Sequence, residues 1–431
     1  MKKTFLLSCL MLAAMPVMAA YTGHVYVDKN KNGVFDQSEK PLAGIKVSDG
    51  LNVVETAADG SFTLPGHERE RFIFITTPSG YKTFNRHYHK IEKKQSGYDF
   101  GLIPYSGRIR KDGSHRYIHI TDTEIFNTEN HADWVNNVRD YARNEQAAFI
   151  IHTGDICYEK GLKAHIKLMN TENMDCPVFY CIGNHDLVKG KYGEELFESI
   201  YGPVYYSFDA GNVHYVVTPM PGGDHAPGYT SDDVCRWLKN DLAHIRPGTP
   251  VVVFNHDLLT YEDTFIFKSK NAGSINLNEY NLKAWVYGHW HINYMKKQGD
   301  VYSVCTSSLD KGGIDHSTTA FRVMHVDSKG DFTSELRYTY LDKNICIASP
   351  AGVMASGVLP VAVNVYSSVS PVREVLYTCL ADGKPVLKNK RLLQSTDWSW
   401  NGELPLSHKY VGKELTLRVT ARFNTVSYTH L

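Results

Sequence analysis

The stretch Val178-Phe179-Tyr180-Cys181-Ile182-Gly183-Asn184-His185-Asp186 predicts the fold more directly than any other part of the chain. It starts as a short apolar run, as a buried β-strand does, and it ends in a cluster of oxygen and imidazole side chains. Four more apolar runs end in the same way. Their polar clusters are Asp122 with Glu124, Gly154-Asp155, Asn255-His256 and Gly288-His289-Trp290-His291. This pattern predicts one site that is assembled from the ends of several strands.

The region from about residue 115 alternates between strand and helix patterns. The predicted strands are 117–121, 147–151, 178–182, 251–254 and 284–287, with a hairpin around 209–212. Two amphipathic helices are predicted, with inward faces formed by Trp134, Val138, Tyr141 and Ala142 and by Val234, Leu238, Leu242 and Ile245. The alternation predicts an α/β core with mostly buried strands, in which a ligand site lies beyond the carboxyl ends of the strands.

The regions on either side have β patterns. Apolar and polar residues alternate in 23–27, 44–47 and 61–64, and the runs 361–366, 375–379 and 415–419 also predict strands. We therefore predict a β-sandwich-like domain over 21–106, a catalytic α/β domain over 107–344 and a β-rich, immunoglobulin-like domain over 345–431. The residues after Phe423 are too few and too irregular to finish a sandwich, so we expect the chain to be truncated there.

Composition and the N-terminus predict an exported protein. The 431 residues exceed one ordinary domain, and Lys+Arg and Asp+Glu both number 46, a balance that argues against wholesale nucleic-acid binding. Lys2 and Lys3 precede an apolar run over 5–15 and small residues at 17–20, as in a signal peptide over 1–20. That run is too short to span a membrane, and no later run is long enough. We expect a periplasmic or cell-surface location.

The cysteines leave the disulfide pattern open. Cys9 belongs to the predicted signal peptide, so seven of the eight cysteines remain, an odd number that cannot pair completely. Most lie in apolar runs, where cysteine acts as a small buried hydrophobe. Cys176 and Cys181 either remain free or form a disulfide, which spacing alone does not decide.

The chemistry of the five clusters suits a pocket for two divalent metals. Two adjacent metals activate a water molecule and withdraw charge from a phosphate ester. The ligand shared by both metals should be a carboxylate, because a carboxylate is anionic and can bind two cations, and Asp155 fits this role. Asn184 offers a carbonyl oxygen, while His256, His289 and His291 offer imidazole. Mixed nitrogen and oxygen ligands favour Mn, Fe or Zn over Ca.

The histidine next to Asn184 has a different predicted role. His185 does not easily bind the same metal as Asn184, because adjacent side chains diverge. We expect it to contact the phosphate or to protonate the leaving oxygen, with Asp186 orienting its ring.

Taken in order, the clusters resemble the blocks of the calcineurin-like metallophosphoesterases, which read D-x-H, G-D, G-N-H-D, H and G-H-x-H. The resemblance covers residues 116 to about 310 and implies a four-layer αββα core. It implies hydrolysis of phosphate mono- or diesters by a hydroxide that bridges two metals. In the ligand sets that it implies, the first metal is held by Asp122, Asp155 and His291 and the second by Asp155, Asn184, His256 and His289, with His185 as the catalytic histidine. The flanking β domains resemble those of secreted bacterial members.

Glu124 departs from that pattern, because the family usually has His at this position. Two outcomes remain open: the carboxylate binds the first metal and favours a harder cation, or it is too long to reach and leaves the first site weak or empty. We predict that Glu124→His raises the affinity for the first metal.

Several other residues have competing interpretations. His119, His152 and His214 follow or lie within strands and are expected to be hydrogen-bonded structural residues. Asp224, His225, Asp315 and His316 lie near Gly-Gly pairs and either belong to turns or border the pocket.

A second ion site is predicted near the N-terminus, where residues 28–39 fit the pattern D-x-[DN]-x-[DN]-G-x5-E. Calcium would be bound by the side chains of Asp28, Asn30, Asn32, Asp36 and Glu39 and by the carbonyl of Val34. The flanking segments are strands, which resembles the calcium loops of bacterial surface adhesins. The alternative is a polar surface turn.

Two classes of function compete at this stage, and within the enzyme class the sequence does not distinguish a general phosphoesterase from a cyclic-nucleotide or nucleotide phosphodiesterase. The first is a phosphoesterase that acts on a phosphate ester and uses two divalent metals. The second is a catalytically impaired protein on the same scaffold, which binds a cell-surface glycan through its β domains.

Overall fold

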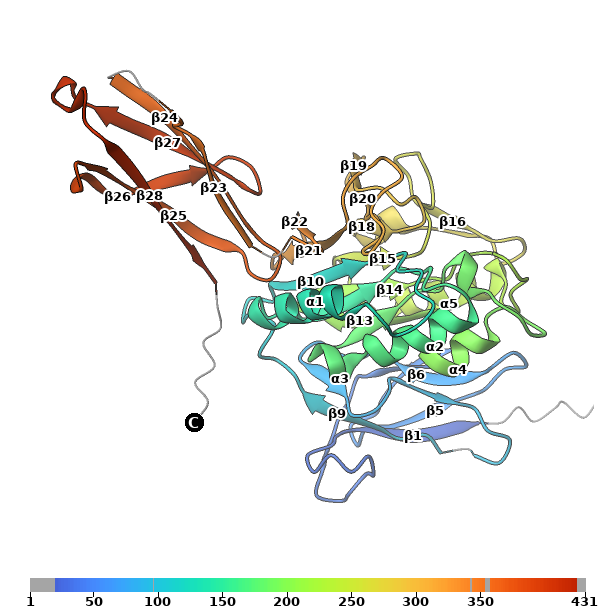
Figure 1. Cartoon of the computed structure of the whole chain (residues 1–431). Coiled ribbons are helices and arrows are strands. Elements are labelled where there is room, and N and C mark those ends of the chain that lie inside the picture. The colour runs from blue at the N-terminus through green and yellow to red at the C-terminus, as the bar shows by residue number, and fades with distance from the viewer. Residues whose placement is uncertain (1–19, 96, 342, 353–356, 425–431) are drawn as a thin grey trace, which may run out of the picture.

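The computed structural model describes residues 20–95, 97–341, 343–352 and 357–424. Residues 1–19 of the expected signal peptide, which include Cys9, lie outside these residues, as does the segment after Asn424. The chain forms three regions that follow one another in sequence, seen in Figure 1 as blue, then teal through green and yellow to light orange, then deeper orange to red. The central region, which contains all five polar clusters, lies between the other two.

One sheet of the central region has the strand order β12-β11-β10-β21-β22. Its strands are β10 (His115–Ile120), β11 (Phe149–His152), β12 (Val178–Tyr180), β21 (Ala320–Val326) and β22 (Phe332–Tyr338). β10, β11 and β12 are parallel, whereas β21 and β22 add to β10 in antiparallel pairing. The ends of β10, β11 and β12 therefore point to the same edge.

The second sheet has the order β13-β14-β15-β18-β20-β19. Its strands are β13 (Tyr206–Ala210), β14 (Val213–Val217), β15 (Val251–Phe254), β18 (Leu282–Tyr287), β19 (Tyr294–Gln298) and β20 (Val301–Cys305). The four strands β14, β15, β18 and β20 are parallel. The short hairpin of β16 (Ile266–Lys268) and β17 (Ser274–Asn276) lies outside this sheet.

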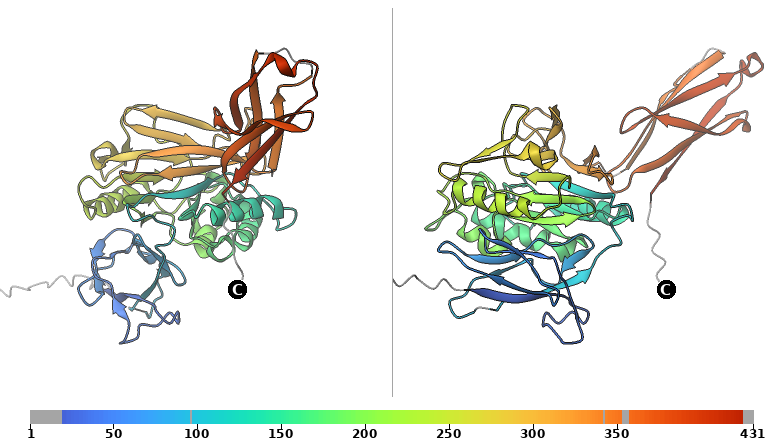
Figure 2. Two further views of the ribbon diagram at one scale, coloured as in Figure 1. Left: turned by 90° about the vertical axis from the view of Figure 1, so that its left-hand side faces the viewer. Right: turned by 180° about the vertical axis from the view of Figure 1, so that it is seen from behind.

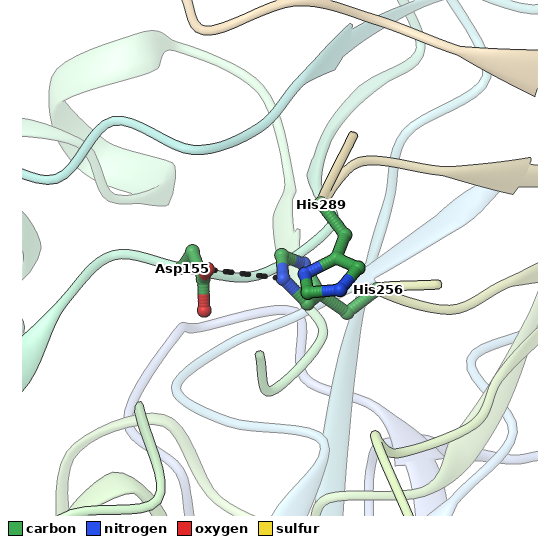
Figure 3. Close-up of side chains that lie close together, drawn as sticks. All are labelled: Asp155, His256 and His289. Atoms are coloured by element: carbon green, nitrogen blue, oxygen red, sulfur yellow. Dashed lines mark ion pairs between the residues drawn. The ribbon is translucent and has the colours of Figure 1, made fainter. Parts of the chain in front are cut away.

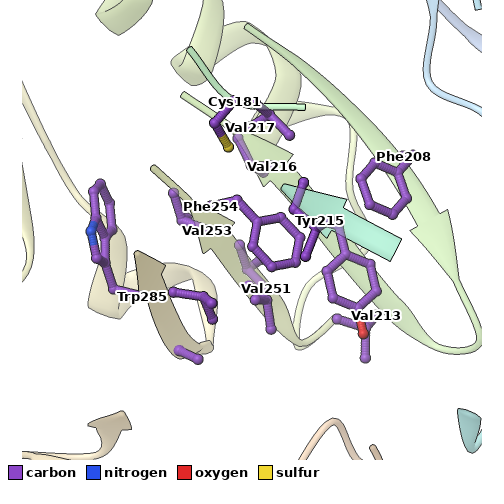
Figure 4. Packing of buried hydrophobic residues seen from close by; sticks show 14 of the residues in the cluster. Cys181, Phe208, Val213, Tyr215, Val216, Val217, Val251, Val253, Phe254 and Trp285 are labelled. Atoms are coloured by element: carbon purple, nitrogen blue, oxygen red, sulfur yellow. The ribbon is translucent and has the colours of Figure 1, made fainter. Parts of the chain in front are cut away.

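The two sheets pack face to face through aromatic residues. The Tyr117 ring of β10 lies 5.8 Å from the Phe254 ring of β15, and the Phe149 ring of β11 lies 4.9 Å from the Tyr215 ring of β14. Figure 4 shows Tyr215 and Phe254 within the buried cluster that continues into β13 and β18. Burial of these rings fixes how the two sets of strand ends face each other.

Helices cover the outer faces of both sheets. The central helices are α1 (Ala132–Asn144), α2 (Tyr158–Leu168), α3 (Thr171–Met174), α4 (Glu195–Tyr201) and α5 (Ser231–Ala243). α1, α2 and α4 bury apolar side chains in one cluster with the outer face of β10 and β11. α5 buries Cys235, Leu238 and Leu242 with the second sheet. Its first turn is capped by Thr230, whose hydroxyl accepts from the Asp233 amide.

The N-terminal region consists of two small sheets. Its strands are β1 (Tyr21–Val27), β2 (Lys40–Pro41), β3 (Lys46–Ser48), β4 (Val53–Glu55), β5 (Ser61–Leu64), β6 (Phe72–Ile75), β7 (Tyr81–Thr83), β8 (Tyr88–Lys90) and β9 (Phe100–Pro104). One sheet contains β2-β1-β9-β7 with β5 on β1, and the other has the order β4-β3-β6-β8. The second sheet shares a core with the central region, since Phe74 packs 6.3 Å from the Trp237 ring of α5.

The C-terminal region is a six-stranded sheet that projects away from the rest in Figures 1 and 2. Its strands are β23 (Lys343–Ser349), β24 (Gly357–Ser367), β25 (Val372–Ala381), β26 (Lys384–Gln394), β27 (Ser399–Leu406) and β28 (Leu415–Phe423). It has its own buried core, which includes Val363, Val375 and Trp400. Its contacts with the central region include the Tyr338 and Tyr366 rings, 5.2 Å apart.

The predicted strands and both predicted helices of the central region are present, with ends that differ by a few residues. Ile245, expected on the inward face of the second helix, lies beyond the end of α5 and is half-buried. All seven cysteines among the described residues are free, so Cys176 and Cys181 form no disulfide. Over the same residues, no helix has the length and apolar character needed to cross a bilayer.

Candidate metal centre

The five polar clusters meet where the carboxyl ends of parallel strands from both sheets face each other. Asp122, Asp155 and the 3-10 turn Asn184–Asp186 follow β10, β11 and β12, while His256 follows β15 and His289 and His291 follow β18. His256 Nε2 lies 3.1 Å from Asp155 Oδ2, and His291 Nε2 lies 3.3 Å from Asp122 Oδ1. Figure 3 shows Asp155, His256 and His289 gathered at one point.

The backbone leaves each strand through a sharp turn that aims these side chains inward. Asp122, Asp155, His289 and His291 all have positive φ angles, between 49° and 63°. Non-glycine residues adopt this conformation at a cost, and such residues cluster at functional sites. The turns explain how polar residues directly after buried strands reach one pocket.

Two glycines of the sequence blocks are required by close packing around these ligands. A Cβ atom on Gly183 would lie 2.2 Å from Asp155 Oδ1, and one on Gly288 would lie 1.9 Å from Thr121 Oγ1. Neither contact is sterically allowed. The glycine that precedes Asn184, and the one that precedes His289, therefore let the loops approach each other.

Three of the predicted ligand atoms are buried without a hydrogen-bond partner: Asp122 Oδ1, Asn184 Oδ1 and His256 Nε2. Two of these atoms have ion-pair contacts instead, since His256 Nε2 lies 3.1 Å from Asp155 Oδ2 and Asp122 Oδ1 lies 3.3 Å from His291 Nε2. Buried polar atoms are nearly always paired, so three orphaned ligand atoms in one pocket need an explanation. Divalent cations bound by carboxylate, amide and imidazole atoms would satisfy all three.

The His256 ring is held in the orientation that a metal ligand needs. Its Nδ1 donates to the Thr153 carbonyl at 2.7 Å, which directs Nε2 toward the pocket. Burial disfavours a charged ring, yet the charges of Asp155 and Asp122 outweigh burial and raise the pKa of His256 to about 10. The two carboxylates therefore favour positive charge at His256 Nε2, the atom that would bind a cation.

Asp155 occupies the centre of the pocket. Its Oδ1 accepts from the His185 amide at 3.0 Å, and its Oδ2 faces His256. Burial acts to raise the pKa of Asp155, but His256 and the His185 amide outweigh it and lower the pKa. Ligand atoms of Asp155, His256 and His289 lie within 4.8 Å of one another, as a shared metal site requires.

Glu124 is the departure from the family pattern, and the structure pairs it with a lysine. Glu124 Oε2 forms an ion pair with Lys311 Nζ, while Glu124 Oε1 lies 3.6 Å from His291 Nε2. The carboxylate therefore reaches the edge of the first metal site, where Lys311 neutralises it. Sequence reasoning did not identify Lys311, which lies in a loop with no recognisable pattern.

The partner of His185 differs from the one expected. His185 Nδ1 lies 2.9 Å from Asp224 Oδ2, so Asp224 orients the ring. Asp186, which was expected to do so, is buried and accepts from the amides of Cys157 and Gly183 at 2.8 and 2.9 Å. The amides of Gly183, in the same turn, and of Cys157, in the turn after β11, bind the Asp186 carboxylate, whereas the ring of His185 points to the loop that contains Asp224.

The pKa values of these two residues reflect their surroundings. Burial alone would lower the pKa of His185, but the hydrogen bond to Asp224 and the charge of Asp155 raise it. Burial and the nearby charge of Asp155 raise the pKa of Asp186 to about 6. His185 is thus disposed to hold a proton, as a residue that protonates a leaving oxygen must be.

The other histidines considered are structural, as predicted. His119 bonds to the hydroxyls of Thr153 and Thr306, and His152 bonds to the hydroxyl of Thr123. His214 lies between Asp209 and Asp241, away from the pocket.

Of the four residues left open, Asp224 is the one whose side chain contacts a predicted site residue within the described part of the chain, through its bond to His185. The His225 amide donates to the Leu187 carbonyl, the Asp315 carboxylate accepts from the Ser317 amide, and the His316 amide donates to the Gly313 carbonyl. The bonds of Asp315 and His316 are local to their loop, whereas the His225 bond joins its loop to the segment directly after the Asn184–Asp186 turn.

The predicted calcium loop uses its side chains in hydrogen bonds within the loop. Asp28 accepts from the amides of Asn32 and Gly33, and Glu39 accepts from those of Lys29 and Asp36. The Asn30 and Asn32 side-chain amides donate to Asp36, while Val34 is exposed. Among the residues that the structure describes, the three-residue groups with metal-ligand spacing do not include this loop. Calcium binding here stays a prediction.

Comparisons with known proteins agree with this geometry. Residues 115–293 match the family described as "Calcineurin-like phosphoesterase", and residues 29–104 match "N terminal of Calcineurin-like phosphoesterase". Purple acid phosphatase 13 from Arabidopsis thaliana is 26% identical over 215 residues, which cover 47% of this chain. The match spans only 36% of that relative's own length.

Among solved structures, an archaeal phosphodiesterase is 13% identical and covers 51% of this chain and 99% of its own, with a TM-score of 0.27. The phosphopantetheinyl hydrolase from Mycobacterium tuberculosis is 14% identical and covers 46% of this chain and 91% of its own, with a TM-score of 0.28. TM-scores this low establish neither a shared fold nor a shared activity.

Proposed function

The chain belongs to the calcineurin-like phosphoesterases, and from this premise we propose that it hydrolyses phosphate mono- or diesters in the pocket described above. The observation that carries the proposal is the set of three buried ligand atoms without a hydrogen bond on Asp122, Asn184 and His256. Two of them have ion-pair contacts with other predicted ligands, His291 and Asp155, and all three are atoms of the kinds that bind divalent metals.

Two cations fit the residues as two overlapping ligand sets. Asp122, Asp155 and His291 would hold the first cation, with Glu124 at its edge. Asp155, Asn184, His256 and His289 would hold the second, so that Asp155 is shared. The nitrogen and oxygen donors favour Mn, Fe or Zn. When bound, these cations supply activation of water and neutralisation of the phosphoryl charge.

The protein's own groups supply the proton and the orientation. His185 reaches the pocket beside Asp155 and would donate its proton to the leaving oxygen of the ester. Asp224 favours the protonated form of His185 and fixes the direction of its ring. Lys311 would add positive charge for an anionic substrate at the side of Glu124.

The test is hydrolysis of p-nitrophenyl phosphate and of its bis-ester with added Mn, Fe or Zn. We expect turnover in the wild type and its loss in Asp155→Ala. Asp331→Ala serves as a control, because this exposed carboxylate pairs with Lys283, at the opposite end of β18 from His289. Absence of turnover with every metal would instead favour the glycan-binding alternative.

The wider assignments are also part of the proposal. The two face-to-face sheets with helices on both outer faces support a four-layer αββα catalytic domain over 107–344. We assign the flanking domains to 21–106 and 345–431, the latter of immunoglobulin-like type, and the location to the periplasm or the cell surface. The N-terminal domain shares a core with the catalytic domain, which supports a structural role for it.

A further inference from the structure

Two aromatic side chains at the edge of the pocket are exposed although both are large and apolar. Phe126 is 54% exposed and Tyr158 is 43% exposed. Their rings are nearly parallel, with centroids 6.3 Å apart and an angle of 14° between the planes. Exposed aromatic surface of this kind commonly marks a binding site.

The pair lies next to the residue that would protonate the leaving group. The Tyr158 ring centroid is 5.4 Å from that of His185. Phe126 comes two residues after Glu124, and Tyr158 comes three residues after Asp155, so both follow metal-site turns. A group attached to the leaving oxygen would therefore extend over Tyr158.

The backbone holds both rings in place. A Cβ on Gly161 would lie 2.4 Å from the Ile125 carbonyl oxygen, so the loop that carries Phe126 packs directly on the first turn of α2. Cys157 and Tyr158 have φ angles of 78° and 56°, which bulky residues rarely adopt. Asp186 secures this turn by accepting from the Cys157 amide. Strain of this kind persists where the surroundings enforce it, and it is typical of functional sites.

We propose that Phe126 and Tyr158 form a platform that stacks on a flat aromatic group in the leaving part of the substrate. The inference rests on the proposed phosphoesterase function and names its substrate class: phosphate esters whose leaving group carries an aromatic or heteroaromatic ring. A nucleobase and a carbocyclic aryl group would both satisfy this chemistry. Both residues determine specificity and neither takes part in bond cleavage.

The test compares benzyl phosphate with cyclohexylmethyl phosphate, because their leaving oxygens are similarly basic and only one has a flat ring. We expect the wild type with Mn to have the higher kcat/KM for benzyl phosphate. In Phe126→Ala and in Tyr158→Ala this preference should fall roughly five- to tenfold, as for loss of one stacking surface. The ratio of the two kcat/KM values is the readout, because any effect of the lost Tyr158 ring on the neighbouring His185 acts on both esters alike, and Tyr158→Phe should keep the preference.

A matched control is Tyr261→Ala. Tyr261 lies in the loop after β15, is 75% exposed, and stacks on the Trp290 ring with centroids 5.9 Å apart. We expect this variant to keep the benzyl preference. Loss of the preference in Tyr261→Ala but not in Tyr158→Ala would overturn the assignment, as would equal kcat/KM values for both esters in the wild type.

A binding measurement separates this inference from the proposed activity. Benzylphosphonate and cyclohexylmethylphosphonate resist hydrolysis, and their Kd values for the metal-loaded protein can be compared by calorimetry. Tighter binding of benzylphosphonate that is lost in Tyr158→Ala supports the platform even if no ester is hydrolysed, whereas equal Kd values refute it. A nucleoside 5′-monophosphate compared with ribose 5-phosphate then distinguishes a nucleobase from a carbocyclic ring.

Discussion

Replacing Lys311 with Met should tighten binding of the first metal. In the wild type, Lys311 Nζ is paired with Glu124, the carboxylate at the edge of that site. A cation that uses Glu124 must displace this ammonium group or share the carboxylate with it. Removing Lys311 frees Glu124 and also removes a positive charge that repels the metal.

The size of the effect follows from the exposure of the pair. The Lys311 side chain is 45% exposed and the Glu124 side chain is 21% exposed, so solvent screens their attraction. Ion pairs of this type contribute about 0.5–1 kcal/mol. Because about 1.4 kcal/mol corresponds to a factor of ten, metal affinity at the first site should rise about two- to fivefold.

The assay is equilibrium dialysis with metal quantification, which separates the two binding steps. Lys413→Met is a matched control, because Lys413 is 44% exposed and pairs with Asp382 in the C-terminal region. A double-mutant cycle with Glu124→Gln tests whether the gain in metal affinity depends on Glu124. Unchanged affinity in Lys311→Met, or an equal gain when Glu124 is already Gln, would refute the role assigned to the pair.

Four further predictions follow from other contacts. Glu124→His should raise the affinity for the first metal, as metal titration will measure; unchanged stoichiometry and affinity would contradict it. Asp224→Asn removes the carboxylate that raises the pKa of His185. We therefore expect kcat/KM to fall about two- to fivefold at alkaline pH, and the alkaline limb of its pH profile to move to lower pH. The control Asp315→Asn should leave the pH profile unchanged. His214→Gln leaves the buried Asp241 without its charged partner and should cost about 3–5 kcal/mol in chemical denaturation at pH 6. Burial opposes the charge on His214, but Asp241 raises the pKa of the ring. The stabilisation by the charged ring is therefore complete below the pKa of histidine in the unfolded chain, about 6.5, and is lost as the pH rises through the pKa of His214 in the folded protein. A pH-independent difference in stability between wild type and His214→Gln would contradict this. Millimolar calcium should raise the melting temperature of the full chain by a few degrees, and Asp28→Ala should abolish the calcium-induced rise; no rise in the wild type would remove the site.

The sequence predicted the strands and most of the pocket because both depend on local patterns. An apolar run that ends in Gly-Asp or Gly-His-Trp-His encodes a buried strand and the turn that follows it, as at Asp155 and His289. Parallel strands then bring such turns to one edge of their sheet, and the packing of two sheets brings both edges together.

Residues that arrive from loops could not be predicted in the same way. Asp224 and Lys311 have no periodic neighbours, and each contacts the site only because its loop folds back over it. Asp186 misled the prediction because sequence proximity to His185 suggested a side-chain contact. The carboxylate is instead bound by two backbone amides, which have no signature in the sequence.

Because the pocket is charged, the Glu124–Lys311 pair affects the binding of an anionic substrate as well as the binding of metal. Asp122, Asp155 and Glu124 bring three negative charges, and Lys311 cancels one of them. A neutral histidine at position 124 would give the same net charge without a lysine. Two divalent cations would leave the complete site with a net charge of about plus two, which attracts a phosphate. Without Lys311 the site binds metal more tightly but attracts the anionic ester less. Lys311→Met should therefore lower the metal Kd and raise KM together, a combination that loss of folding or simple loss of a ligand would not produce.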